Sequence, residues 1–249
     1  MVKPVNSDNI KTKILSSSRV LSVIEAEAQK MVDKKASSLD EEKKILSKEA
    51  IRIVNDMVGE IKMPVIRFMA WCLHKIFRSI YEKVNINNEA LKKLKEIQQE
   101  QNIPVVFMPT HKSYIDFLIV SYILFVYQQK LPYIVSDEAL LKASVIPFLI
   151  RSSGAFFYKK KEYKNSRLYK IIFDKYVELL LRDGNNMEFF IEGTRSRTGK
   201  ILKPQCEFLN IIFDTVYNDK VNDVLLVPLT INYEKVLEGD TFPSELLGE

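Results

Sequence analysis

Glycine, proline, cysteine and histidine are all scarce in this chain of 249 residues, which contains 7 Gly, 9 Pro, 2 Cys and 2 His. So few Gly and Pro residues exclude a collagen-like or low-complexity chain. Cys72 and Cys206 alone make no disulfide framework, and with two histidines they supply too few ligands for a Cys/His metal site. The sequence therefore predicts no metal site of this kind.

Long apolar runs are also missing. The longest uncharged run has 13 residues, from Phe117 to Gln129, whereas a helix needs about 20 residues to cross a bilayer. No apolar run follows Lys3 near the start of the chain, so we expect no secretory signal. The sequence therefore predicts a chain that does not itself span a membrane.

What the chain does contain is apolar and basic material. It is 47% hydrophobic and has a net charge of +5, which suits a sizeable core and an anionic partner such as a phosphorylated metabolite, an acidic lipid surface or a nucleic acid. A nucleic-acid binder would interleave basic residues with exposed aromatic residues over a broad face. Here the aromatic residues lie mostly in apolar, core-like runs, so we predict no nucleic-acid partner.

The first quarter of the chain has a helical pattern. We expect residues 1–60 to form an N-terminal helical lead-in and residues 61–249 to form the main domain. Residues 1 to about 40 are polar and rich in Ser and Lys, which predicts loose packing. From Asp40 a helix is expected, because acidic residues in its first turn suit the positive end of the helix dipole.

Residues 64–84 predict a second helix that is apolar over most of its circumference. Its basic residues fall on one narrow stripe: Arg67, His74, Lys75 and Arg78. One interpretation is a core helix with a solvated edge. The other is an interfacial helix, with Trp71 at the acyl boundary of a membrane and the basic stripe at the headgroups.

From residue 104 onward, short apolar runs alternate with helical patterns. Strands are expected at 104–108, 133–135, 155–158, 187–191 and 224–231, and helices at 116–127, 140–151, 168–181 and 208–217. This alternation predicts an α/β fold with a mostly parallel, twisted sheet flanked by helices. In such sheets functional residues collect in the loops that leave the carboxyl ends of the strands.

The loop after the first expected strand carries His111, with Asp116 five residues later. A neutral imidazole can take a proton from a hydroxyl at physiological pH, and a carboxylate can orient it. The alternative is structural, because Ser113 and Asp116 resemble a capping box in which the carboxylate only accepts backbone N–H groups.

Two further loops are basic. Residues 192–200 follow the fourth expected strand and combine glycines, hydroxyl residues and cations, which suits an anion cradle; the spacing of Gly193 and Gly199 does not fit a nucleotide P-loop. A strand that starts at Gly154 is followed by three lysines, at 159–161. These lysines either contact a phosphate or are simply the solvated end of the strand. No nucleophile elbow is present, so direct transfer of a group onto a substrate hydroxyl is the simpler chemistry.

Four blocks, in this order, resemble the glycerophospholipid acyltransferase family. They are His-x-x-x-x-Asp at 111–116, Gly-x-x-Phe-x-basic-basic at 154–160, Phe-x-Glu-Gly-Thr-Arg-Ser at 190–196, and a Val-Pro block at 227–233. Within the family, the first and third blocks and the glycine-led strand are most similar to the branch that acylates dihydroxyacetone phosphate. Relatives in this branch are longer, so the sequence is expected to be a fragment or a short form.

The resemblance implies an enzyme that transfers a long-chain acyl group from acyl-CoA to dihydroxyacetone phosphate, in glycerophospholipid and ether-lipid synthesis. Glycerol 3-phosphate and lysophosphatidate are alternative acceptors, and a non-catalytic lipid-binding remnant is a second alternative. Acyl-CoA would be a co-substrate and no cofactor is expected. Peripheral association with a membrane is implied, the peroxisomal membrane first and the endoplasmic reticulum or mitochondrial membrane as alternatives.

The resemblance also assigns roles to residues. His111 would be the general base and Asp116 would orient it. Lysines replace the usual arginine pair at 159 and 160, which removes the bidentate geometry. The residues implied in substrate binding are Lys112, Ser113, Gly154, Lys159, Lys160, Glu192, Gly193, Thr194, Arg195, Arg197 and Pro228.

Overall fold

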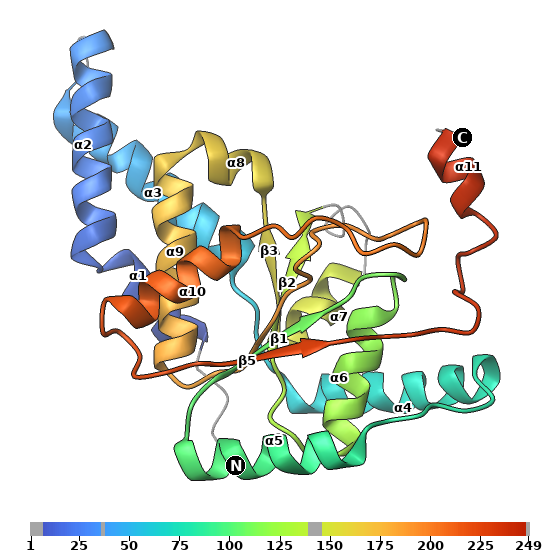
Figure 1. The fold of residues 1–249 in the computed structure, drawn as a ribbon. Coiled ribbons are helices and arrows are strands. Elements are labelled where there is room, and N and C mark those ends of the chain that lie inside the picture. Colours follow the sequence, from blue (N-terminus) through green and yellow to red (C-terminus); the bar gives the residue numbers. More distant parts are fainter. Residues whose placement is uncertain (1–6, 36–37, 139–145, 248–249) are drawn as a thin grey trace. The chain divides into compact units, whose positions relative to one another are not determined.

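The computed structural model describes residues 7–35, 38–138 and 146–247, and it has the expected α/β architecture (Figure 1). Its sheet has five strands in the order β3-β2-β4-β1-β5. β1 pairs in parallel with both β4 and β5, and β2 pairs in parallel with β4. The predicted fold class, a parallel sheet flanked by helices with further helices at the N-terminus, is confirmed. The strands are β1 (Val105–Pro109), β2 (Tyr133–Asp137), β3 (Ala155–Tyr158), β4 (Met187–Glu188) and β5 (Leu225–Leu229).

The chain divides into two compact units, each made of two separate stretches. One comprises residues 1–62 and 136–183, and the other residues 63–135 and 184–249. The division expected between residues 60 and 61 stays a prediction. The helices of the first unit are α1 (Ser7–Leu15), α2 (Ser18–Lys35), α3 (Leu39–Met57), α7 (Ile146–Ser152), α8 (Lys160–Asn165) and α9 (Arg167–Arg182). Those of the second are α4 (Met63–Ile80), α5 (Asn88–Gln101), α6 (Asp116–Val126), α10 (Glu207–Tyr217) and α11 (Phe242–Leu247).

The N-terminal helices are well packed, so the prediction of a loose stretch over residues 1 to about 40 is wrong for the described part. α2, α3 and α9 lie side by side, and α1 contacts both α3 and α9 (Figure 1). In α1 and α2 the apolar residues recur every three or four positions, which places them on one side of each helix. That side faces the neighbouring helices and is buried although much of the rest of each helix is polar. The buried residues on these sides are Ile10, Ile14, Val20, Val23, Ile24 and Ala28.

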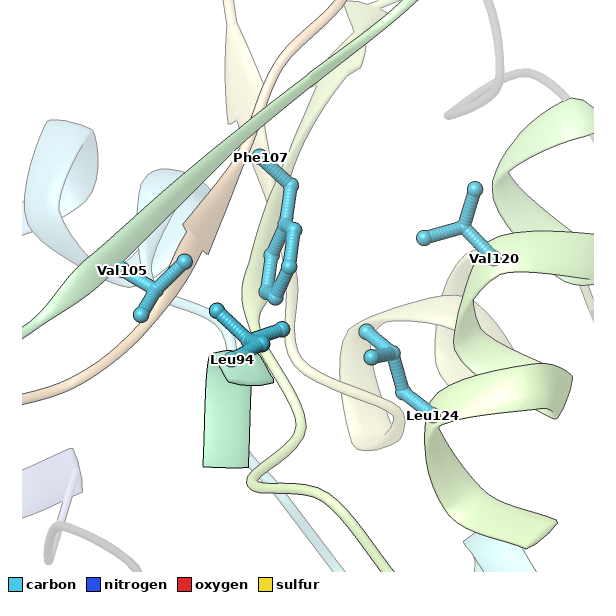
Figure 2. Packing of buried hydrophobic residues seen from close by; sticks show 5 residues of the cluster. All are labelled: Leu94, Val105, Phe107, Val120 and Leu124. Atoms are coloured by element: carbon cyan, nitrogen blue, oxygen red, sulfur yellow. The ribbon is translucent and has the colours of Figure 1, made fainter. Parts of the chain in front are cut away.

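The second unit has its core between β1, α5 and α6. Side chains from these three elements point toward one another in Figure 2, which shows Leu94, Val105, Phe107, Val120 and Leu124. Alternate residues of β1 face this core because side chains alternate across a strand. The core thus holds β1, α5 and α6 against one another.

The other expected elements lie close to their predicted positions, with one clear difference. β4 ends at Glu188 rather than at residue 191, because the chain turns away and the N–H of Gly193 donates to the carbonyl of Phe190 at 2.9 Å. The described part of α7 is Ile146–Ser152 and includes Pro147. The earlier part of the helix expected at 140–151 falls outside the described residues.

α4 buries only one of its faces. Ile66, Ala70, Leu73 and Phe77 are buried, whereas the side chains of Phe68 and Trp71 are 57% and 60% exposed. Among the described residues, no helix combines the length and apolar character needed to cross a membrane.

Candidate functional site

The candidate site is built on the loop between β1 and α6, in the unit of residues 63–135 and 184–249. The loop starts at Thr110, whose N–H donates to the carbonyl of Leu229 at 2.9 Å and whose hydroxyl accepts the N–H of Ile231 at 3.1 Å. These bonds continue the pairing of β1 with β5 beyond the strand ends. The fold therefore fixes the start of the loop that carries His111.

His111 and Asp116 meet within this loop. Nδ1 of His111 lies 3.0 Å from Oδ2 of Asp116, whose side chain is fully buried, while the imidazole side chain is 16% exposed. The imidazole also stacks on Phe190, with the ring centroids 4.1 Å apart. With Nδ1 bonded to the carboxylate, Nε2 is the ring nitrogen that can accept a proton from a substrate.

Asp116 has a structural task as well as this contact. Its Oδ2 accepts the backbone N–H groups of Lys112 at 2.7 Å and Ser113 at 2.9 Å. The two interpretations of the sequence, a capping carboxylate and a partner of His111, are therefore compatible in one side chain. The contact itself is a feature of the structure, whereas the catalytic role of the pair stays a prediction.

Glu192 ties the second predicted loop to the first. It is 4% exposed, and its Oε1 accepts the N–H of His111 at 3.0 Å while its Oε2 accepts the N–H of Leu202 at 2.9 Å. The N–H of Ser196 donates to the carbonyl of His111 at 2.8 Å. The sheet order explains this proximity, because β1 and β4 are neighbours and their loops leave the same edge.

The cationic residues of the two loops take different positions. Lys112 donates from Nζ to Oδ1 of Asn232 at 2.9 Å. Arg195 is buried, and its guanidinium lies 3.4 Å from the ring centroid of Tyr114, while Arg197 is exposed. A guanidinium over an aromatic ring is held in place by a cation–π contact.

The other residues of this unit that were predicted to bind substrate lie on the two loops and on β5. Gly193 has a φ of 67°, in the region that favours glycine, and a Cβ there would lie 3.0 Å from Cγ of Gln205. Ser113 is buried, Thr194 is exposed, and Pro228 is exposed on β5 opposite Met108 of β1.

Three predicted residues belong to the other unit, of residues 1–62 and 136–183. Gly154 is buried with a φ of 97°, at the turn that leads into β3. Nζ of Lys159 lies 3.2 Å from Oε1 of Glu162 and 4.0 Å from Oδ2 of Asp56, and Lys160 is exposed at the start of α8. Their expected role in binding a phosphate stays a prediction.

The segment that follows β5 contributes contacts that the sequence did not predict. The hydroxyl of Tyr233 donates to Oδ1 of Asp116. Glu238 accepts both the hydroxyl of Ser113 and the N–H of Tyr114 at 2.6 Å. Tyr233 lies in the Val-Pro block, which gave it no role, and nothing in the sequence marks Glu238 as part of the site.

Burial and the charge of Asp116 raise the pKa values of two groups near it, Glu188 and Tyr233. Burial, followed by the charge of Asp116, raises the pKa of Glu188 well above its ordinary value. Burial, then the bond to Asp116, raises the pKa of Tyr233 in the same direction. Both shifts favour the neutral, protonated forms of Glu188 and Tyr233.

Comparison with known proteins shows which family the chain belongs to. The family model described as Acyltransferase matches residues 83–232. The chain is 37% identical over 248 residues to a dihydroxyacetone phosphate acyltransferase of Bos taurus and 36% identical to that of Homo sapiens, covering 99% of this chain and 35% of each relative. It is 32% identical over 254 residues to the mitochondrial glycerol-3-phosphate acyltransferase 1 of Homo sapiens, covering 99% of this chain and 30% of the relative. The chain thus spans about a third of the length of these relatives.

Proposed function

Because the chain belongs to the acyltransferase family, we propose that it transfers a long-chain acyl group from acyl-CoA to the hydroxyl of dihydroxyacetone phosphate. The observation that carries this proposal is the contact of His111 with a buried Asp116, in a loop joined by Glu192 to a cationic loop. A general base beside cations suits an acceptor that has both a hydroxyl and a phosphate. The names of the similar proteins support the same class of acceptor.

The proposed reaction needs one proton transfer in each direction. Nε2 of His111 takes the proton of the acceptor hydroxyl while the hydroxyl oxygen attacks the carbonyl carbon of the thioester. The tetrahedral intermediate collapses, the carbon–sulfur bond breaks, and the imidazolium returns the proton to the leaving thiolate of CoA. Asp116 stabilises the imidazolium, and general-base help of this kind is worth about a hundred- to ten-thousand-fold in rate. Acyl-CoA serves as a co-substrate, and this chemistry requires no cofactor.

Binding of the phosphate is assigned to the cations. Lys112 lies next to His111 and is bonded to Asn232, and Arg195 lies over the ring of Tyr114, which is in the same loop as Lys112. These two cations are the first candidates, followed by the exposed Arg197. Arginine can bind two phosphate oxygens at once, whereas lysine acts as a point charge. Lys159 and Lys160 are further candidates on the grounds of the motif alone.

The function is tested by offering the chain a radiolabelled long-chain acyl-CoA with one acceptor at a time. We expect kcat/KM to be highest with dihydroxyacetone phosphate, lower with glycerol 3-phosphate and lysophosphatidate, and very low with dihydroxyacetone, which lacks the phosphate. Equal rates with and without the phosphate would contradict the assigned role of the cations. Transfer to lysophosphatidate alone would replace the proposed acceptor.

Peripheral membrane binding is a further part of the proposal, supported by the exposed face of α4. Phe68 and Trp71 stack there with ring centroids 6.4 Å apart, and Arg67 and Arg78 are exposed on the same helix. Exposed aromatic residues flanked by cations suit an anionic lipid surface. The peroxisomal membrane is the proposed location, with the endoplasmic reticulum or mitochondrial membrane as alternatives. Replacing Phe68 and Trp71 by Ser should abolish flotation with anionic liposomes, and undiminished flotation would contradict this assignment.

A further inference from the structure

The two oxygens of the Asp116 carboxylate have different partners. Oδ2 faces Nδ1 of His111 and accepts the N–H groups of Lys112 and Ser113, all from its own loop. Oδ1 accepts the hydroxyl of Tyr233, which lies 117 residues further along the chain. We propose that Tyr233 is a positioning residue, which acts through Asp116 to set the orientation and proton affinity of His111. The consequence for catalysis rests on the proposed function, whereas the consequence for His111 does not.

Several contacts of the surrounding residues hold Tyr233 in place. It follows β5, whose pairing with β1 continues through Thr110 and Ile231. Its neighbour Asn232 accepts Nζ of Lys112 at 2.9 Å, so two successive residues of this segment contact the His111 loop. The ring of Tyr81 stacks on that of Tyr233 with the centroids 6.3 Å apart.

Tyr233 is suited to be a permanent donor. Burial raises its pKa, and the bond to Asp116 and the charge of Asp116 raise it further. The hydroxyl therefore keeps its proton throughout the physiological range and cannot compete with His111 as a base. Its bond fixes the rotation of the carboxylate, so that Oδ2 stays directed at the imidazole.

Removing this hydroxyl leaves one oxygen of a fully buried carboxylate without a donor. The negative charge is then less dispersed, and the His111–Asp116 pair holds an added proton more tightly. The N–H groups of Lys112 and Ser113 still hold Oδ2 beside the imidazole, so the carboxylate can only tilt within this contact. Other titratable or charged groups near the pair stay the same in this change: Tyr81, Lys112, Glu188, Glu192 and Glu238.

Tyr81 provides a matched control. It stacks directly on Tyr233, and burial with the charges of Asp116 and Glu238 raises its pKa as well. Its hydroxyl is buried but has no hydrogen-bond partner among the described residues. Tyr81→Phe therefore removes the same atom next to the same carboxylate without removing a hydrogen bond.

The first test follows the imidazole of His111 by NMR as a function of pH. The chain has only two histidines. The signal that disappears in His111→Gln belongs to His111, and the signal that remains belongs to His74. In Tyr233→Phe we expect the titration midpoint of His111 to rise by about half a pH unit, or about threefold in proton affinity. In Tyr81→Phe it should stay at the natural value. An unchanged midpoint in Tyr233→Phe, or equal shifts in both variants, would overturn the proposal.

The second test measures acyl transfer. We expect Tyr233→Phe to lower kcat about tenfold with little change in either KM, because the hydroxyl of Tyr233 is bonded to Asp116 and acts through it. In the Asp116→Asn background the same change should have almost no effect, since two residues that act through one group are not additive. An equal loss in both backgrounds would show that Tyr233 acts independently of Asp116. Should the natural chain transfer no acyl group, the proposed function fails, while the NMR titration still decides the role of Tyr233.

Discussion

Glu192 offers the sharpest test of how the two loops of the site are joined. Its buried carboxylate is the acceptor for the N–H of His111 at 3.0 Å and for the N–H of Leu202 at 2.9 Å. Glu192→Ala removes both acceptors at once and leaves two N–H groups in partly buried positions. The change therefore removes one of the two hydrogen bonds that join the loop of residues 192–200 to the loop of His111, and leaves the bond from the N–H of Ser196 to the carbonyl of His111.

The expected cost follows from the two bonds. A hydrogen bond to a charged acceptor contributes about 1.5–3 kcal/mol, and water can partly replace the lost acceptor because both N–H groups are only partly buried. We therefore expect Glu192→Ala to lower the free energy of unfolding by about 2–4 kcal/mol. Glu192→Gln should lose about half as much, because its amide keeps one carbonyl oxygen and turns the other acceptor into a donor.

The measurement is urea unfolding followed by far-ultraviolet circular dichroism. Glu96→Ala on the exposed face of α5 is the control, and a surface change of this kind should stay within about 0.5 kcal/mol of the natural chain. If Glu192→Ala were as stable as Glu96→Ala, the reasoning that Glu192 joins the loops would be refuted.

Two further predictions concern stability. Burial raises the pKa of Glu188 well above its ordinary value of 4.5, so the native state keeps a proton that the unfolded chain releases, and the free energy of unfolding falls as the pH rises above that value. Glu188→Gln should therefore gain stability relative to the natural chain between about pH 5 and about pH 8 in urea unfolding, and a constant difference would contradict this. Gly59→Ala should destabilise the chain by about 1–3 kcal/mol through overpacking, because its Cβ would lie 2.4 Å from the carbonyl oxygen of Ala155; an unchanged thermal midpoint would argue against that close approach.

The order of strands and helices could be predicted from the sequence because each buried strand is a short apolar run between breakers. The extent of β4 could not. The apolar run continues through residue 191, yet the chain turns after Phe189, and Phe190 stacks on His111 instead of extending the sheet. An apolar side chain fits a strand and a ring stack equally well, so composition does not distinguish them.

For the N-terminal helices the sequence predicted too little packing, whereas for β4 it predicted too long a strand. Their buried residues are few and lie in a stretch rich in Ser and Lys, a composition that predicts loose packing. Spacings of three and four still place Ile10 with Ile14, and Val20 with Val23 and Ile24, on one face of each helix. The period of the apolar residues was therefore more informative than their number.

The site was predictable where it depends on strand ends. Parallel strands place their following loops at one edge, which predicts that the loops of His111 and Glu192 lie together. The contacts of Tyr233 and Glu238 depend on the path of an irregular segment after β5, and no periodic pattern encodes that path. Their contacts are therefore visible only in the folded structure.

The central claim, that His111 is the general base, is tested most directly by the kcat of His111→Gln with dihydroxyacetone phosphate and acyl-CoA. Lys93→Gln, on the exposed face of α5, is the control and should keep the natural rate. We predict that His111→Gln lowers kcat by about a hundred- to ten-thousand-fold with the fold retained. A kcat equal to that of Lys93→Gln would contradict the account.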